Sequence, residues 1–393
     1  MVRKLLKWIG YILLAFVLLL AIFAAFNWTL ARNMAKIGGA KITQIDRFAP
    51  RETVRGCPAQ PPATDAGLLP AATFAAMKRY SDGQGGVGLI VLIDGKIAGE
   101  DYAEGADAQT RTLSFSMHKT VVALAVGAAV QDGLIRSIDD PVGDYLSEWK
   151  DDQRGKITLR QLLTMSSGLH NYSMSKMEMG AFDMMMGDDV SKRALEAKLD
   201  DTPGSTFNYN NVNPQIAGII LSRVLQKAGR GRYADYLSQK IWCPLGNGDA
   251  SLWLEREGRQ PRYFAYLDSA LRDWARVGLL IGANGNFAGK QMLPAQWIAE
   301  MTKASAANPR YGLLTWRGSP WVKARRYSRE VALTVPHKEA YLADDVVFLD
   351  GFGGQRVYIV PSAKLVIARS GETSLTWEDS VLVNTALRGI KTK

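Results

Sequence analysis

The first hydrophobic stretch of the chain is also the longest. Residues 8–31 carry no charge, are rich in Leu, Ile, Ala and Phe, and follow a short basic cluster. A membrane-spanning helix needs about 20 such residues, whereas the apolar core of a cleaved signal peptide has only about 7 to 15. The pattern favours an N-terminal transmembrane helix within residues 1–31. The sequence "TLA" at residues 29–31 leaves a cleaved signal peptide as the alternative.

Residues 32–72 follow the apolar N-terminal segment and precede the first clear strand pattern. The part from Arg55 to Ala72 is rich in Pro and Gly, a composition typical of loops and linkers. We therefore interpret residues 32–72 as a linker between the N-terminal segment and a domain over residues 73–393.

The domain begins with strand signals, and a hydrophobic helix follows them. Residues 87–102, "VGLIVLIDGKIAGEDY", contain two strand-like runs around Asp94-Gly95, a dipeptide typical of a tight hairpin. Residues 113–130 read "LSFSMHKTVVALAVGAAV". A helix that is apolar on all sides is expected to be central in the fold.

Helical patterns dominate the middle of the chain, and strands return at its end. The helical segments are residues 158–168, 213–229, 232–242, 269–285 and 293–304. The later strand-like segments are residues 310–316, 345–351 and 356–370, and a helix follows at 377–387.

Strands at both ends with helices between them predict an α+β fold. One antiparallel sheet with flanking helices would be built from both terminal segments, about residues 73–136 and 304–393. An inserted all-helical lobe would occupy residues 137–303. We expect a functional site in the cleft between these lobes.

The net charge of +10 is concentrated near the N-terminus. Six basic residues precede the first acid, and they are Arg3, Lys4, Lys7, Arg32, Lys36 and Lys41. The excess left for the body is small and scattered, which argues against nucleic acid as a partner.

The positions of the cysteines and histidines bear on two further features, a disulfide and a metal site. Cys57 and Cys243 would pair in an oxidising compartment and would otherwise be free thiols, and the sequence leaves both alternatives open. His118, His170 and His337 have no companion ligands at metal-site spacing, so we expect neither a metal nor another cofactor.

A serine and a lysine three positions apart open the hydrophobic helix. Ser116 and Lys119 would share one helix face, and burial would lower the pKa of the lysine so that it could accept the serine proton. Ser-x-x-Lys is weak alone, because about one match per chain of this size is expected by chance. A second match, Ser173 to Lys176, lies in a Met-rich stretch without clear period, so we expect a loop there.

Two further elements add to this pair. Tyr209-Asn210-Asn211 stands just before a helix, where the phenol could carry a proton to a leaving group. Residues 349–361, "LDGFGGQRVYIVP", place glycines between two strands, where a substrate could approach the backbone and an N–H could stabilise an oxyanion.

These elements, in this order, resemble the serine hydrolases related to class C β-lactamases and penicillin-binding DD-peptidases. The resemblance covers roughly Gly86 to Ile390. The fragments "TMSSGL" at 164–169, "WLEREG" at 253–258 and "GFGGQ" at 351–355 are similar to the branch that includes 6-aminohexanoate-dimer hydrolases. The fold implied is the β-lactamase/transpeptidase-like one.

The resemblance also implies roles for individual residues. Ser116 would be the nucleophile, Lys119 its base, Tyr209 the proton carrier, and Asn211 a contact of the substrate or of the lysine. It leaves open whether Lys119 or Tyr209 takes the first proton. The oxyanion hole would consist of the N–H groups of Ser116 and Phe352.

One departure from the family pattern bears on the substrate. Where β-lactamases and DD-peptidases have Lys-Thr-Gly or His-x-Gly, this chain has Leu349-Asp350-Gly351, so the cation that would meet a substrate carboxylate is missing. A neutral amide or ester is therefore expected to bind near Gly351 and Phe352. Tyr172, in the Met-rich stretch of residues 165–186, is a further candidate substrate contact.

The Met-rich stretch is either an adaptable lid or filler of the helical lobe, and His118 is expected to face solvent or a helix neighbour.

The implied function is hydrolysis of a small-molecule amide or ester by an enzyme anchored in the membrane, with its catalytic domain outside the cytoplasm. The alternatives are a DD-peptidase or weak β-lactamase, and a non-catalytic module that binds cell-wall or lipid fragments. The sequence leaves the oligomeric state open.

Overall fold

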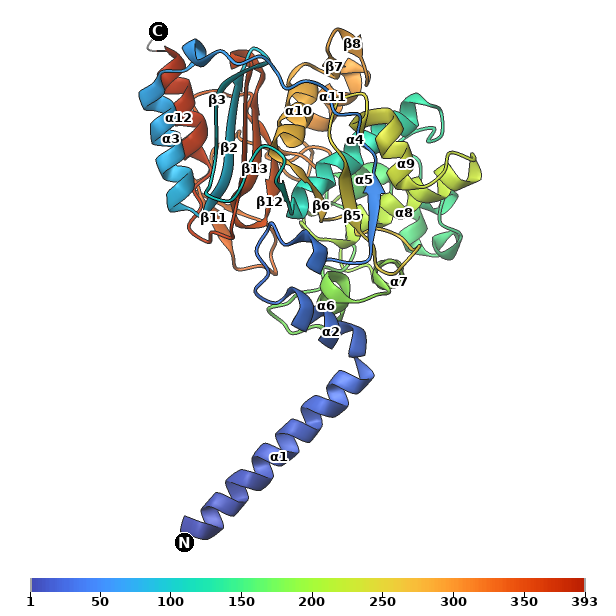
Figure 1. The fold of residues 1–393 in the computed structure, drawn as a ribbon. Coiled ribbons are helices and arrows are strands. Elements are labelled where there is room, and N and C mark those ends of the chain that lie inside the picture. The colour runs from blue at the N-terminus through green and yellow to red at the C-terminus, as the bar shows by residue number, and fades with distance from the viewer. Residues whose placement is uncertain (1, 392–393) are drawn as a thin grey trace.

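An N-terminal helix precedes the body of the protein. The computed structural model describes residues 2–391, and its first helix, α1, spans Val2–Phe26 and extends away from the body (Figure 1). Within α1, Arg3–Ile22 has a mean hydropathy of 2.5 and is not buried against the protein. Its length and composition fit a membrane-spanning anchor or a signal sequence.

The larger sheet is built from both ends of the domain, as the strand pattern predicts. In the described part of the chain its order is β3-β2-β14-β13-β12-β9, and all neighbours are antiparallel. The strands are β2 (Gly86–Ile93), β3 (Lys96–Tyr102), β9 (Trp316–Arg317), β12 (Val347–Gly351), β13 (Gln355–Val360) and β14 (Leu365–Gly371). The predicted hairpin at Asp94-Gly95 is confirmed, with positive φ at both residues. The predicted α+β arrangement is thus confirmed.

Helices cover both faces of this sheet (Figure 1). α3 (Ala71–Gly83) and α12 (Ser380–Lys391) pack together on one face, and α10 (Leu271–Gly282) packs on the other. Gly278 of α10 allows this close approach, because a Cβ there would lie 2.6 Å from Val366 of β14. The sequence pattern assigns α10 to the inserted lobe, whereas its apolar face belongs to the sheet.

The second lobe is not purely helical, which corrects the predicted all-helical insertion. Its helices are α4 (His118–Gln131), α5 (Leu159–Leu163), α6 (Met179–Met186), α7 (Val190–Leu195), α8 (Val212–Lys227), α9 (Tyr233–Leu237) and α11 (Ala295–Thr302). A second sheet in the described residues has the order β1-β5-β6-β4, and its strands are β1 (Arg51–Val54), β4 (Arg111–Thr112), β5 (Ala250–Trp253) and β6 (Leu267–Ala270). Two hairpins are formed by β7 (Asn286–Phe287) with β8 (Lys290–Gln291) and by β10 (Ala324–Arg326) with β11 (Thr334–Pro336). β1 and β4 pair with strands more than 150 residues away, so their local pattern did not reveal them.

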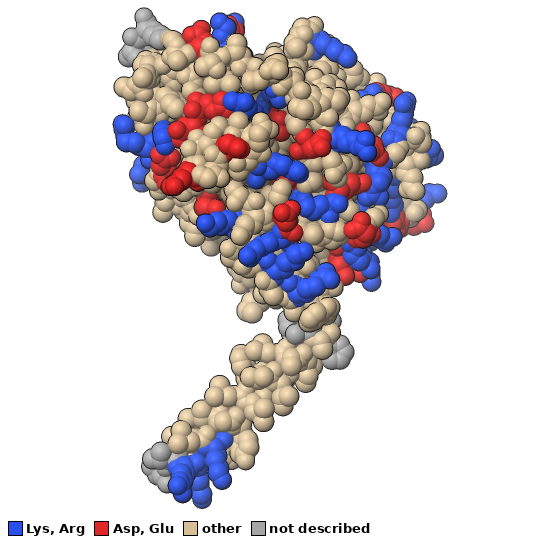
Figure 2. Space-filling model, viewed as in Figure 1, with Lys and Arg blue, Asp and Glu red and all other residues tan. Residues whose placement is uncertain are grey.

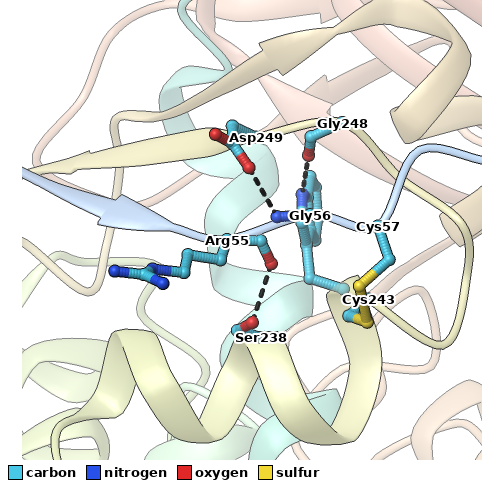
Figure 3. The surroundings of a disulfide bond; sticks show 8 residues. Arg55, Gly56, Cys57, Ser238, Cys243, Gly248 and Asp249 are labelled. Carbon is cyan, nitrogen blue, oxygen red and sulfur yellow. Dashed lines mark hydrogen bonds between the residues drawn. A yellow bond between two sulfur atoms is a disulfide. The ribbon is translucent and has the colours of Figure 1, made fainter.

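The segment interpreted as a linker is packed onto the body. Helix α2 (Trp28–Ile37) packs against α6, and β1 pairs with β5. Cys57 and Cys243 form a disulfide, which settles the alternative that the sequence left open. Around it, Ser238 Oγ donates to the carbonyl of Arg55 at 2.7 Å, and Gly56 N–H donates to Asp249 (Figure 3).

Candidate active site

Ser116 lies at a strained turn that enters the central helix. The turn Phe115–Met117 leads directly into α4, and Phe115 has a φ of 45°. A bulky residue rarely adopts this left-handed conformation, so the surrounding packing must hold it there. Ser116 itself is only partly buried and reaches the cavity described below, while most of α4 is buried.

Lys119 is buried one turn beyond Ser116. Its side-chain nitrogen, Nζ, lies 2.9 Å from each of three oxygens: Ser116 Oγ, Asn211 Oδ1 and the carbonyl of Phe264. Only 1% of the residue is exposed. Burial lowers the pKa of Lys119 to about 7, although the nearby Asp350 carboxylate acts in the opposite direction.

The three partners orient the lysine lone pair. A neutral amine has two N–H donors and one lone pair, whereas the Asn211 oxygen and the Phe264 carbonyl can only accept. When both N–H groups are used in this way, the lone pair points to Ser116 Oγ. Neutral Lys119 is therefore placed to accept the hydroxyl proton of Ser116.

Tyr209 lies beside the Ser116–Lys119 pair. Its side chain interacts with that of Ser116, and its ring centroid is 4.9 Å from Lys119 Nζ. The ring packs against Trp316 and Tyr327. Burial, with the Asp350 carboxylate as the next cause, raises the pKa of Tyr209 well above its usual value, so its resting form is the neutral phenol.

The end of β12 forms the third wall. A Cβ on Gly351 would lie 2.3 Å from the carbonyl oxygen of Ser114, so only glycine allows this strand to approach the nucleophile turn. Phe352 follows, is 42% exposed, and its ring lies edge-on to that of Phe115 at 6.1 Å. The backbone after Gly351 thus borders the space in front of Ser116.

Asp350 is buried behind this wall in a network of charges. It contacts Arg325 at 2.6 Å and Arg356 at 2.5 Å, and Tyr327 donates to it at 3.1 Å. Both arginines also contact Asp379. Two carboxylates and two guanidinium groups balance one another, so the Asp350 carboxylate is neutralised by internal partners.

A cavity of about 580 Å³ opens in front of Ser116. Most of its wall is apolar, and the apolar and aromatic side chains are Phe115, Tyr172, Met174, Ala181, Met184, Met185, Tyr209, Val212, Phe264, Ala265, Tyr266, Tyr327, Val331, Ala332, Leu333 and Phe352. Among the described lining residues, the charged side chains are the acids Glu330 and Asp350. The wall thus suits an apolar group and disfavours a negatively charged one.

The structure brings most of the predicted site residues together. Ser116, Tyr172, Tyr209, Asn211 and Phe352 all line the cavity, while Lys119 lies directly behind Ser116. Gly351 lies next to Phe352 in the wall. Asn211 contacts the lysine, which was one of its two expected roles.

The second Ser-x-x-Lys match lacks a comparable environment. Ser173 lies in a loop, as expected, and its hydroxyl pairs with that of Ser175. Lys176 is exposed, so it lacks the buried environment of Lys119. Of the two expected environments for His118, solvent is excluded because the residue is fully buried, and a helix neighbour is found because its ring contacts Tyr233 of α9. Its other ring nitrogen contacts two backbone carbonyls. In the Met-rich stretch Met165 is part of the core, as the filler role predicts, whereas Met174 and Met185 line the cavity.

Sequence reasoning missed several groups that shape this site. The Phe264 carbonyl is a backbone acceptor, so no residue type could have revealed it. Arg325 and Arg356 lie on β10 and β13 and meet Asp350 only in the folded chain. Glu330 accepts from Asn171 at 3.1 Å in the cavity wall.

A curated protein is similar to part of this chain in sequence. Protein flp from Staphylococcus aureus (strain COL) is 24% identical over 171 residues, which cover 41% of this chain and 33% of flp. The chain therefore matches about a third of the length of this curated relative.

Solved structures share the fold over nearly the whole chain. A 6-aminohexanoate-dimer hydrolase homologue from Bacillus anthracis is 20% identical with a TM-score of 0.69, covering 89% of this chain and 92% of that chain. A D-stereospecific amidohydrolase from Streptomyces sp. is 19% identical with a TM-score of 0.57, covering 81% of this chain and 98% of that chain. These likenesses show the shared fold.

The family assignment rests on the sequence as well. Residues 71–373 match the sequence model of the β-lactamase family, and this range contains all three motif elements. The match confirms the resemblance inferred from those motifs. The chain belongs to the β-lactamase family.

Proposed function

We propose that this chain is a serine hydrolase that cleaves an amide or ester bond through an acyl-enzyme on Ser116. The observation that carries the proposal is the 2.9 Å contact between Ser116 Oγ and a buried lysine whose pKa is lowered to about 7. A serine hydroxyl needs such a base to become a nucleophile. The names of the two structural neighbours, an amidohydrolase and a dimer-hydrolase homologue, support amide cleavage.

In acylation, Lys119 takes the hydroxyl proton while Ser116 Oγ attacks the carbonyl carbon. The ammonium that forms lies 4.9 Å from the ring of Tyr209 and 5.7 Å from that of Phe264, within range of cation–π stabilisation. Tyr209, a neutral phenol, donates its proton to the leaving nitrogen or oxygen, and the lysine ammonium then restores that proton. The raised pKa of Tyr209 favours Lys119 as the first base.

The negative charge that develops on the carbonyl oxygen needs hydrogen-bond donors. The N–H groups of Ser116 and Phe352, two residues of the cavity wall, fill this role in the proposal. The N-terminus of α4, which begins two residues after Ser116, adds partial positive charge. Water then attacks the acyl-enzyme, gives up a proton to the Lys119–Tyr209 pair, and releases the acid as Ser116 regains its proton.

The charge of the cavity narrows the substrate class. A carboxylate next to the scissile bond, as in β-lactams and D-Ala-D-Ala peptides, would face Glu330 and a neutralised Asp350 without a basic partner among the described lining residues. We therefore propose a neutral or cationic amide or ester as the substrate and poor turnover of a chromogenic β-lactam. Asn211 and Tyr172 line the cavity and are proposed to contact that substrate, while Asn211 also positions Lys119.

The catalytic domain is proposed to lie outside the cytoplasm, anchored through α1. The Cys57–Cys243 disulfide supports an oxidising compartment, and the dense basic cluster before the apolar helix favours a cytoplasmic N-terminus. The intact mass of the mature protein distinguishes a retained anchor from a cleaved signal peptide. Protease treatment of spheroplasts tests the orientation, because only an external domain is degraded.

Labelling with an active-site-directed fluorophosphonate tests the nucleophile. We expect one adduct per chain, located at Ser116 by peptide mapping and absent from Ser116→Ala. Ser173→Ala is the matched control, because it removes the serine of the other Ser-x-x-Lys match and should label normally. An adduct at Ser173, or none under conditions that label a known hydrolase, would refute the proposal and favour a non-catalytic binding module.

A further inference from the structure

The cavity wall lies next to the helix that continues the anchor. Met184 and Met185 of α6 line the cavity, and α2 packs against α6. Asn33 of α2 donates to the carbonyl of Met186 at 2.6 Å, and Thr29 donates to Asp188 at 3.0 Å. Packed helices lie about 8–10 Å apart, so a single helix separates α2 from the cavity. Figure 1 shows both helices at the end of the body from which α1 emerges.

The exposed face of α2 suits the surface of a bilayer. Trp28 is 64% exposed, and Arg32 and Lys36 follow on the same face at intervals of four residues. Trp prefers the membrane–water interface, and basic residues there meet anionic headgroups. Only Asn27 lies between α1 and α2, so a bilayer spanned by α1 reaches α2 directly. Figure 2 shows basic side chains on the part of the body nearest to α1.

The opening of the cavity is largely apolar. Lining residues that are also exposed mark this opening, and they are Met174, Ser175, Val331, Ala332, Phe352 and Thr373. Met177 and Met179 follow Met174 closely in the segment that leads into α6, and they are 77% and 41% exposed. Large apolar side chains gathered at a surface mark contact with a partner or a membrane. We refer to Met174, Met177 and Met179 as the methionine rim.

From these observations we infer that the substrate is a membrane-partitioned amphiphile whose apolar acyl chain passes from the bilayer surface, across the methionine rim, into the cavity. This inference rests on the proposed hydrolase function. The acyl chain forms the ester with Ser116, the neutral or cationic head leaves with a proton from Tyr209, and water releases the fatty acid. The bilayer that holds α1 thus both anchors the enzyme and supplies its substrate.

The dependence of activity on the length of the substrate's acyl chain tests this inference. The full-length protein is reconstituted in vesicles of phosphatidylcholine with phosphatidylglycerol and given p-nitrophenyl acetate or p-nitrophenyl decanoate. Each methylene that leaves water strengthens binding about fourfold, so we expect kcat/KM for the decanoate to exceed that for the acetate by at least about tenfold. Equal values, or a preference for acetate, would overturn the inference. Fluorophosphonate labelling of the same sample shows separately whether the nucleophile is active, so failure of the proposed function is recognised independently.

Substitution of the rim tests the route of entry. Met177→Glu and Met179→Glu place a charge where the acyl chain crosses, and we expect each to lower the decanoate-to-acetate ratio at least about fivefold. Leu342→Glu is the matched control, because Leu342 is also exposed, at 41%, and lies outside the cavity wall. The control should keep the wild-type ratio. An unchanged ratio in both rim variants, or the same fall in the control, would contradict entry across the rim.

Discussion

At the scale of the residue, the environment of Lys119 decides the chemistry. A lysine in water is protonated at neutral pH and cannot act as a base. Burial in α4 and two fixed acceptors, Asn211 and Phe264, convert it into an amine that faces Ser116. The same two residue types at Ser173 and Lys176 have no such environment, because Lys176 is exposed.

The pKa of Lys119 predicts an acid limb in the pH–rate profile. Lys119 must be neutral to accept a proton and becomes protonated as the pH falls through its value of about 7. We expect kcat/KM for p-nitrophenyl acetate to be level above this pH and to fall about tenfold per unit below it. A profile that stays flat down to pH values near the pKa of an ordinary carboxyl group would exclude Lys119 as the base.

Removal of the Asp350 carboxylate should change both stability and this pH profile. Asp350→Asn leaves Arg325 and Arg356 short of a buried partner, so we expect a loss of about 3–5 kcal/mol in the free energy of unfolding. Asp350 also raises the pKa of Lys119, so its removal should shift the acid limb to lower pH. Denaturant unfolding and kcat/KM profiles measure the two effects.

Asp94→Asn provides the matched control for that substitution. Asp94 pairs with Lys364 at 2.8 Å, but both side chains are more than half exposed. Such surface pairs contribute at most about 1 kcal/mol. We expect nearly unchanged stability and an unshifted acid limb, and a shift equal to that of Asp350→Asn would refute the local electrostatic explanation.

At the scale of the element, the approach of β12 to the nucleophile turn forms the site. Gly351 makes that approach possible, and the Phe115 turn positions Ser116 opposite it. The glycine-containing motif was visible in the sequence, because its residues are consecutive. The close contact with Ser114 was not, because it joins segments more than two hundred residues apart.

Gly351→Ala should therefore impair catalysis. A Cβ at this position meets the Ser114 carbonyl at 2.3 Å and Gln355 Cβ at 2.7 Å, so β12 must move away from Ser116. A displacement of about 1 Å can lower the rate about a hundredfold, and we expect a fall in kcat of that order with slower fluorophosphonate labelling. Gly83→Ala, where no atom lies within 4 Å of the added Cβ, should leave kcat unchanged. Normal kcat in Gly351→Ala would show that the contact does not position the site.

At the scale of the whole molecule, the chain after the anchor is tied to the body. β1 completes the second sheet, α2 packs on α6, and Cys57 is bound to Cys243 across 186 positions of sequence. In the arrangement proposed above, α1 therefore holds a defined face of the enzyme, the one with the methionine rim, toward the membrane.

Loss of the disulfide should weaken the fold but spare the site. Cys243→Ser removes a cross-link that restricts the unfolded chain, and we expect a loss of about 2–4 kcal/mol in the free energy of unfolding. Neither cysteine lines the cavity, so kcat on p-nitrophenyl acetate should be retained. The free energies of unfolding of the variant and of the reduced wild type, measured with denaturant, should agree. If the variant were as stable as the oxidised wild type, the disulfide would not stabilise the fold.

Local patterns in the sequence determined the apolar N-terminal helix, the Asp94-Gly95 hairpin, the buried α4 and the three motif elements. Each of these depends on neighbouring residues, whose spacing and hydrophobicity are visible along the chain. The tertiary structure alone decided the disulfide, the second sheet, the placement of α10, the charge network around Asp350 and the proximity of α6 to α2. It also decided the lowered pKa of Lys119. These properties arise from desolvation and from contacts between distant segments, which exist only once the chain has packed.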